Sequence, residues 1–133
     1  MTLYEVKKRS VINNGVEIEL LNVNKSPNRQ INMIKHIVFF GLEDSAEGKT
    51  KAENAKVIKF ELENLIHLIP ELNKIEVGIN HPDAPQGNHD ICLYTEFDTF
   101  EALDIYQEHP QHKRVAAYIG KVKTSRAAVD YEV

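Results

Sequence analysis

From Met33 onward, the apolar residues of the chain alternate between two spacings, and the order of these spacings constrains the fold more than any other feature. Every second residue is apolar where a half-buried strand is expected, and every third or fourth where a helix packs on a core. The order is strand, helix, strand, strand, divided helix, strand. This is the order of the ferredoxin-like βαββαβ motif, so we predict an α+β fold with an antiparallel sheet and helices on one face.

Four segments have the residue pattern of strands. Residues 34–41 (IKHIVFFG) are rich in β-branched and aromatic residues and end at a glycine, so we expect a largely buried strand. Residues 74–80 (KIEVGIN) and 90–97 (DICLYTEF) alternate apolar with polar residues and are joined by a loop. Residues 124–133 (TSRAAVDYEV) alternate in the same way, which predicts the last strand of the sheet.

A capping box indicates where the first helix begins. Thr50 and Glu53 form the T-x-x-E pattern, in which each side chain accepts a backbone N–H at the start of a helix. Apolar residues then recur three and four apart, as on the buried face of an amphipathic helix: Ala55, Ile58, Leu62, Leu65 and Ile69. The pattern predicts one long helix that ends at Pro70.

The segment before the last strand predicts two helices separated by a bend. Asp98 and Glu101 form a second helix-start pattern, followed by residues expected to share one face: Phe100, Leu103 and Tyr106. A residue before proline avoids helical geometry, whereas proline itself suits the first turn of a helix. We therefore expect the second helix to stop at His109 and a third, short helix to begin at Pro110, with His109 near its N-cap.

The charge of the chain divides near Met33. Residues 1–32 carry five Lys/Arg and three Asp/Glu, a net +2, whereas residues 33–133 carry eleven and seventeen, a net −6. We interpret residues 1–32 as an N-terminal extension and residues 33–133 as the main domain. Two interpretations of the extension stay open: a hairpin that turns at Asn14 and Gly15, or an upstream segment that does not order, with Met33 as the natural start of the domain.

The charge pattern argues against nucleic acid and membrane as partners. The net charge of −4 comes without the dense stripe of lysine and arginine that phosphate backbones and anionic lipids favour. The apolar runs, such as IVFF at residues 37–40, are far shorter than the ~20 residues of a membrane span. The single cysteine, Cys92, allows no internal disulfide, which indicates a reducing compartment such as the cytoplasm.

The sequence also lacks the usual patterns for cofactors and metals. It contains no glycine motif of the Rossmann or Walker type, so we expect no nucleotide cofactor. His109 and His112 are three residues apart, but Pro110 disrupts the helical register between them, and no further ligand stands at a recognisable spacing. We therefore expect neither a cofactor nor a functional metal.

The alternating strands carry apolar residues on both of their faces, and this predicts a partner. In residues 90–97, for example, Cys92 and Tyr94 lie opposite Ile91 and Leu93. Helices on one face of the sheet leave the other face uncovered, and a second copy of the sheet would bury it. We therefore expect a homodimer whose two sheets enclose a barrel-like core.

Several blocks of the sequence, in this order, resemble the stress-responsive A/B barrel domain, or Dabb, of the dimeric α+β barrel superfamily. They are MIKHIVFF (33–40), VGIN (77–80), EFDTFEALDIYQEHPQHKRVAAYI (96–119) and SRAAVDYEV (125–133). The resemblance spans residues 33–133 and leaves residues 1–32 uncovered. It implies a dimer of ferredoxin-like subunits, each with a cavity between its sheet and its helices.

The resemblance also implies three candidate catalytic residues. One plant member of the family, olivetolic acid cyclase, closes a polyketide ring without a cofactor and carries the motif Y-x-x-H-P-x-H. Its catalytic tyrosine and histidine match Tyr106 and His112 in this motif, and the histidine of its first strand matches His36. Leu62 and Ile91 stand where the cyclase has a further tyrosine and histidine, so the same ring closure is not implied.

These residue types suit the removal of a proton next to a carbonyl group. Histidine titrates near ~6.5, whereas tyrosine, near ~10, stays protonated and can donate to a developing oxyanion. We expect His112 to act as the base, Tyr106 to stabilise the oxyanion, and His36 to orient one of them. This predicts a cofactor-free enzyme of the isomerase, lyase or cyclase type that binds a small organic molecule in an apolar cavity.

Structural roles explain the same residues equally well. Tyr106 can tie its hydroxyl to the backbone, His112 can bond a nearby carbonyl, and His109 can cap the helix that follows it. Two other functions also stay open: a non-catalytic stress-associated or ligand-binding dimer, and a cofactor-independent monooxygenase. A pocket with the polar atoms of Tyr106 and His112 directed into it favours an enzyme, and a filled core favours a binding protein.

Overall fold

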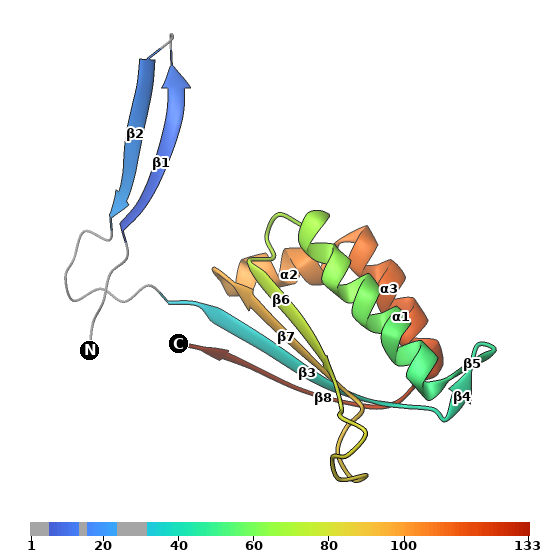
Figure 1. Cartoon of the computed structure of the whole chain (residues 1–133). Helices are drawn as coiled ribbons and strands as arrows, with labels where there is room; N and C mark the ends of the chain where they lie inside the picture. Colours follow the sequence, from blue (N-terminus) through green and yellow to red (C-terminus); the bar gives the residue numbers. More distant parts are fainter. Residues whose placement is uncertain (1–5, 14–15, 24–31) are drawn as a thin grey trace. The chain divides into compact units, whose positions relative to one another are not determined.

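The structure, a computed structural model, describes residues 6–13, 16–23 and 32–133, with side chains from residue 32 onward. The chain divides into two compact units, Met1–Asn32 and Met33–Val133. In the first unit, strands β1 (Val6–Asn13) and β2 (Val16–Val23) pair antiparallel (Figure 1). The turn expected at Asn14 and Gly15 lies outside the described residues.

Residues 33–133, all of which the structure describes, form an antiparallel sheet with the α-helices on one face (Figure 1). Across the sheet the strands are β6 (Lys74–Ile79), β7 (Ile91–Phe97), β3 (Ile34–Leu42) and β8 (Lys123–Glu132). The helices are α1 (Lys51–Asn64), the 3₁₀ helix η1 (Leu65–His67), α2 (Phe100–Glu108) and α3 (Pro110–Val122). A short hairpin, β4 (Ser45–Ala46) and β5 (Lys49–Thr50), precedes α1. The predicted ferredoxin-like α+β fold is confirmed.

The register of the sheet decides which side chains lie beneath the helices. In β3, alternate residues are buried on this side, among them His36 and Phe40. Residues directly opposite each other in an antiparallel pair share a face of the sheet. Because Asp130 is opposite His36 and Arg126 is opposite Phe40 in the β3–β8 pair, these two charged residues of β8 lie on the helix side.

Helix α1 begins where the sequence predicts and ends earlier. The capping box is confirmed, since Glu53 N–H donates to Thr50 Oγ1 at 3.2 Å and Thr50 N–H donates to Glu53 Oε1 at 2.9 Å. The predicted single helix to Pro70 is wrong, because the α-helix ends at Asn64 and continues as η1. The residue before a proline avoids helical geometry, and the tighter 3₁₀ turn ends the helix before it.

Helix α2 begins one residue later than predicted. The N-cap is Thr99, whose Oγ1 accepts the Ala102 N–H at 3.0 Å, whereas the Asp98 carboxylate accepts Asn73 Nδ2 at 2.8 Å. Of the three residues expected to share one face, Leu103 and Tyr106 are buried, whereas 52% of the surface of Phe100 is exposed. Phe100 is the first residue of the helix, only three residues after β7 ends, so it lies at the margin of the core.

The core lies between the sheet and the helices. It is formed by aliphatic and aromatic residues of both layers, among them Val38, Ile58, Leu93, Phe97 and Val115. Burial of this apolar surface is the main favourable term in the folding of the domain. Within the described part of the chain, no helix is long and apolar enough to cross a membrane.

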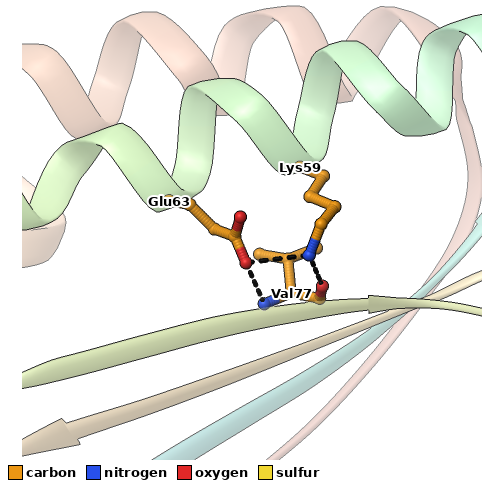
Figure 2. A network of polar contacts seen from close by, with 3 residues as sticks. All are labelled: Lys59, Glu63 and Val77. Atoms are coloured by element: carbon orange, nitrogen blue, oxygen red, sulfur yellow. Dashed lines mark hydrogen bonds and ion pairs between the residues drawn. The ribbon is translucent and has the colours of Figure 1, made fainter.

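Side chains of α1 cover the outer edge of β6 at one residue (Figure 2). Glu63 Oε2 accepts the Val77 N–H at 3.0 Å and Lys59 Nζ at 2.9 Å, and Lys59 also donates to the Val77 carbonyl at 2.5 Å. An edge strand otherwise presents unpaired N–H and C=O groups to other chains. Both outward groups of Val77 are occupied here, so β6 cannot pair with another strand at this residue.

The face of the sheet opposite the helices carries exposed apolar side chains. Phe39, Val129 and Tyr131 are 36%, 49% and 40% exposed, and β8 is exposed along its whole length. In β8, Ala127, Val129 and Tyr131 lie on this open face, whereas Ala128 and the charged residues Arg126 and Asp130 lie on the helix side. An apolar surface of this kind on a folded domain is typical of an interaction face.

Candidate functional site

The bend between α2 and α3 is built by His109 and Pro110. His109 has an extended backbone (φ −63°, ψ 135°) between the two helices, and Pro110 is the first residue of α3. The His109 Nδ1 accepts the Gln111 N–H at 3.1 Å, so the predicted capping role of His109 is confirmed. This cap closes one helix and starts the next, which fixes the direction of the chain at the bend.

The bend brings Tyr106 and His112 into contact. Tyr106 is in the last turns of α2 and His112 is in the first turn of α3, yet their ring centroids are only 4.6 Å apart, with the ring planes at 58°. The Tyr106 ring also packs against Phe97, at 5.0 Å between centroids. The two residues on either side of the proline therefore converge, and Tyr106 is fully buried.

Two polar atoms of this pair have no hydrogen-bond partner. Among the residues that the structure describes, the Tyr106 hydroxyl and the His112 Nδ1 are the buried side-chain polar atoms left unpaired. The buried Thr95, by contrast, donates to the His36 carbonyl at 2.7 Å, and the buried Asn54 accepts the Tyr118 hydroxyl. The structural alternative for Tyr106, a hydrogen bond from its hydroxyl to the backbone, is therefore not observed.

His36 is buried on β3 and is held by an acidic residue that the sequence did not indicate. Its Nδ1 and Asp130 Oδ1 are 2.5 Å apart, and Asp130 comes from the neighbouring strand β8. The carboxylate fixes the proton on Nδ1, so in a neutral ring Nε2 is the acceptor. In the described part of the chain, His36 makes no side-chain hydrogen bond to Tyr106 or His112. The pairing of β8 with β3 is the signal that could identify Asp130.

A cavity of about 100 Å³ lies beside these residues. Its polar lining consists of His36, Gln107, His112, Lys123 and Arg126, and its apolar lining consists of Val38, Phe40, Leu62, Leu93, Ala116 and Ile119. Tyr106 does not line this cavity and lies against His112, which does. Leu62 forms part of the wall, whereas Ile91 does not. The sequence did not indicate Gln107, Lys123 and Arg126 as site residues.

Burial sets the protonation states of the central pair. It lowers the pKa of His112, an effect that the Gln107 carbonyl opposes and the positive charge of Arg126 reinforces. Burial also raises the pKa of Tyr106 well above its usual range. At neutral pH, His112 is therefore a neutral base and Tyr106 is a neutral hydrogen-bond donor.

Other parts of the domain offer less to a reactive ligand. Hollows of about 570 and 820 Å³ lie around the β6–β7 loop, and in the described residues neither is lined by a buried polar atom without a partner. The described ranges 6–13, 16–23 and 32–133 contain no group of three or more His, Cys, Asp or Glu side chains that could hold a metal ion. The cavity beside His36 and His112 is therefore the candidate site.

Solved structures with the same fold include close relatives of this chain. A dimeric protein of unknown function with a ferredoxin-like fold from Bacteroides fragilis is 35% identical, with a TM-score of 0.62 over 76% of this chain and 96% of that chain. A dimeric ferredoxin-like protein from Thermobifida fusca is 27% identical, with a TM-score of 0.67 over 78% and 93% of the two chains.

More distant similarity extends to a named enzyme. The hydroxynitrile lyase from Passiflora edulis is 14% identical, with a TM-score of 0.61 over 76% of this chain and 93% of that chain, which shows a shared fold. A comparison with functionally curated proteins gives no match. The family model of the stress responsive A/B barrel domain matches residues 34–133. This match covers most of the chain, which therefore belongs to the Dabb family, as its sequence blocks predict.

Proposed function

We propose that the protein is a cofactor-free acid/base enzyme of the isomerase, lyase or cyclase type, acting on a small organic molecule with a carbonyl group. The observation that carries this proposal is the pair of unpaired buried atoms, Tyr106 Oη and His112 Nδ1, beside the cavity. A buried polar group without a hydrogen bond costs roughly 1–3 kcal/mol of folding free energy. Such a group is therefore expected where a ligand can supply the missing hydrogen bond. The neutral base and the neutral donor are the pair that proton abstraction requires.

In the proposed reaction, His112 removes a proton from the carbon next to the ligand carbonyl. The electron pair of the broken C–H bond moves into the C–C bond, and the carbonyl oxygen becomes an oxyanion. The Tyr106 hydroxyl donates to this oxyanion through one water, because Tyr106 lies behind His112 rather than in the cavity wall. The proton on His112 then returns to another carbon or to a leaving group, which restores the enzyme.

His36 contributes as a fixed acceptor in the lining of the cavity. Asp130 holds its Nδ1, so its Nε2 is available to a ligand hydroxyl or to a water. The name of the Passiflora neighbour, a hydroxynitrile lyase, is consistent with lyase chemistry on this fold. At 14% identity it supports the scaffold and not the reaction.

Binding without turnover is the second candidate function, and one observation favours it. Ligand pockets usually enclose roughly 300–1,000 Å³. The cavity here is about 100 Å³, and the Tyr106 hydroxyl does not line it. A ligand-binding or stress-associated dimer would use the same cavity without needing the Tyr106 donor.

We also propose that the protein is a homodimer through the open face of its sheet. The helices cover the other face, and β8 turns Ala127, Val129 and Tyr131 toward the open side. A second copy of the sheet would bury these residues and close a barrel between the subunits. The relatives from Bacteroides fragilis and Thermobifida fusca are both described as dimeric.

Proton exchange on simple ketones tests the acid/base proposal. The protein is incubated in D₂O with 2-pentanone, levulinate or methyl levulinate, and deuterium next to the carbonyl is followed by NMR. We expect exchange above the buffer rate, reduced at least ~100-fold in Tyr106→Phe and His112→Gln. Exchange that both variants retain would contradict the assignment, and binding without any exchange would favour the second function. Oxygen consumption in the same samples would indicate a monooxygenase.

A further inference from the structure

The lining of the candidate cavity has a strong charge bias. Lys123 and Arg126 are the basic side chains of the lining, and the other polar lining groups are Gln107 and two histidines. No carboxylate contributes to the lining in the part of the chain that the structure describes. Cavities that bind a ligand by charge carry the opposite sign to the ligand, so this lining is suited to an anion.

The two basic side chains have no acidic partner in the part of the chain that the structure describes. Within the described residues, neither Lys123 nor Arg126 makes an ion pair or a side-chain hydrogen bond. Three acidic side chains of this domain are used by other groups. Asp130 holds His36 at 2.5 Å, Glu108 pairs with Lys113 at 2.9 Å, and Glu47 pairs with Lys121 at 3.7 Å. The two cations that border the cavity are thus left for a ligand.

The position of Arg126 in the sheet explains why its charge reaches the site. It is opposite Phe40 in the β3–β8 pair, and Phe40 is a buried residue of the cavity wall. Its side chain therefore lies on the helix side of β8, four residue pairs along from Asp130 and His36. Its charge also acts on His112 across the cavity. Arg126, on β8, and His112, on α3, therefore line the same cavity.

We infer that the substrate is a small keto acid, whose carboxylate is bound by Arg126 and Lys123 while its reacting carbon faces His112. The catalytic part of this inference rests on the proposed acid/base function, whereas the carboxylate site rests on the charges and the register alone. A guanidinium group binds a carboxylate through two parallel N–H donors, which orients a small ligand as well as attracting it. In a cavity of about 100 Å³, such an orientation decides which carbon meets the base.

The class of ligand follows from size as well as charge. The cavity is too small for the whole of a drug-sized molecule, so the acid end and the keto group of a small substrate fill it. Lys123 and Arg126 are both exposed in β8, so the carboxylate keeps contact with solvent. Binding is therefore expected to weaken as the salt concentration rises.

A matched pair of probes tests the inference on the full chain. Levulinate and methyl levulinate have the same keto chain, but only levulinate carries a negative charge. Binding is followed by NMR of the His112 imidazole as each probe is titrated into wild type, Arg126→Gln and the control Arg114→Gln. Arg114 is an exposed arginine of α3 that pairs with Glu61 at 3.0 Å and does not line the cavity.

We expect levulinate to bind at least about tenfold more tightly than its ester, and this preference to disappear in Arg126→Gln but not in Arg114→Gln. Equal binding of acid and ester, a preference that Arg126→Gln retains, or no saturable binding of levulinate would each overturn the inference. Inorganic phosphate is the competing probe, and tighter binding of phosphate than of levulinate would overturn the carboxylate in favour of a phosphoryl group.

Proton exchange in the same samples separates this inference from the proposed function. Arg126-dependent binding of levulinate without deuterium incorporation supports the carboxylate site and contradicts the acid/base function. Equal exchange on levulinate and methyl levulinate, lost in His112→Gln, supports the acid/base function and overturns the keto acid. Faster exchange on levulinate alone, lost in both Arg126→Gln and His112→Gln, supports both.

Discussion

The rings of Tyr106 and His112 lie 4.6 Å apart, and each carries a buried polar atom that no other described residue satisfies. Two such atoms side by side cost stability, because each loses its hydrogen bonds to water on folding. The rest of the buried polar side chains, His36, Asn54 and Thr95, all have partners. The two unpaired atoms thus lie beside the cavity, at the bend between α2 and α3.

Replacing Tyr106 with phenylalanine is expected to separate function from stability. The hydroxyl has no partner in the fold, so its removal should leave the free energy of unfolding unchanged or raise it by up to about 1 kcal/mol. Proton exchange on a bound ketone should fall at least ~100-fold, because the oxyanion loses its donor. Urea unfolding and deuterium incorporation measure the two effects on the same protein.

The matched control for this variant is Tyr118→Phe. Tyr118 is on α3, and its hydroxyl donates to the buried Asn54, so the same substitution should cost about 1 kcal/mol of stability and leave exchange intact. A loss of stability in Tyr106→Phe equal to that in Tyr118→Phe would mean that the Tyr106 hydroxyl is a structural group.

The lowered pKa of His112 predicts a specific dependence of stability on pH. Burial lowers the pKa of His112 in the folded state below the ~6.5 of an unfolded chain. Between the folded and unfolded pKa values of His112, the unfolded state binds more protons. The contribution of His112 to the free energy of unfolding is therefore fully present above about pH 6.5 and is lost as the pH falls below it. In His112→Gln this part of the pH dependence should disappear.

Urea unfolding midpoints at about pH 7.5 and about pH 5 measure this difference. The control is His81→Gln, because His81 is exposed in the β6–β7 loop and its substitution should leave the pH dependence as in wild type. A wild-type pH dependence in His112→Gln would contradict the assignment of His112 as a neutral buried base.

The order of elements and the bend could be predicted from the sequence because both depend on local patterns. Alternation marks the strands, the Thr50 and Glu53 box marks the start of α1, and Pro110 marks the division between α2 and α3. The exact start of α2 could not be predicted in this way, because Asp98 and Thr99 are both suitable N-cap residues. In the structure the Asp98 carboxylate accepts Asn73 Nδ2, and Thr99 caps the helix instead.

The composition of the site depended on pairings that local patterns do not contain. Asp130 and Arg126 belong to the polar set of the last strand, and a polar set is usually assigned to solvent. The pairing of β8 with β3 instead turns this set toward the helices and the apolar set toward the open face. The partner of His36 and the charge of the cavity thus follow from the tertiary fold.

Asp130 is expected to position His36, and Asp130→Asn tests this role. The amide cannot hold the Nδ1 proton as the carboxylate does, so the two tautomers of His36 become closer in population. Exchange should fall roughly tenfold to a hundredfold, the usual cost of losing a group that orients an active-site histidine. Nitrogen-15 NMR of the imidazole should show the change of tautomer, which a merely structural role would not produce.

The control for this variant is Glu132→Gln. Glu132 is on the same face of β8 but is opposite Ile34 in the register, away from His36. An unchanged His36 tautomer in Asp130→Asn would contradict the positioning role, whatever happened to the rate.

Glu63→Ala is expected to open the edge of β6 at Val77 (Figure 2). Burial alone would raise the pKa of Glu63, but its hydrogen bonds to Lys59 and to the Val77 N–H, with the charge of Lys59, lower it overall. The loss of this carboxylate should cost on the order of 1 kcal/mol, because the group is partly exposed. The Val77 amide should also exchange with solvent faster than in wild type.

Hydrogen exchange by NMR and urea unfolding measure these effects, with Glu76→Ala as the control. Glu76 is an exposed acid of the same strand that makes no side-chain hydrogen bond among the described residues. The lowered pKa of Glu63 also predicts that the contribution is present above about pH 4.3 and is lost as the pH falls through the lower folded value. Equal effects of Glu63→Ala and Glu76→Ala would contradict the edge-covering role.

Val129→Asp is expected to convert the proposed dimer into a monomer. Val129 is 49% exposed on the open face, and a second sheet packed there would surround the new carboxylate with apolar side chains. An unpaired buried charge costs about 3 kcal/mol or more, so the dissociation constant should rise at least ~100-fold while the subunit keeps its fold. The control is Phe60→Asp, since Phe60 is 70% exposed on α1 and lies away from the open face.

Native mass spectrometry reports the monomer and the dimer directly. A wild-type monomer, or a dimer that Phe60→Asp breaks and Val129→Asp does not, would show that the open face of the sheet is not the interface.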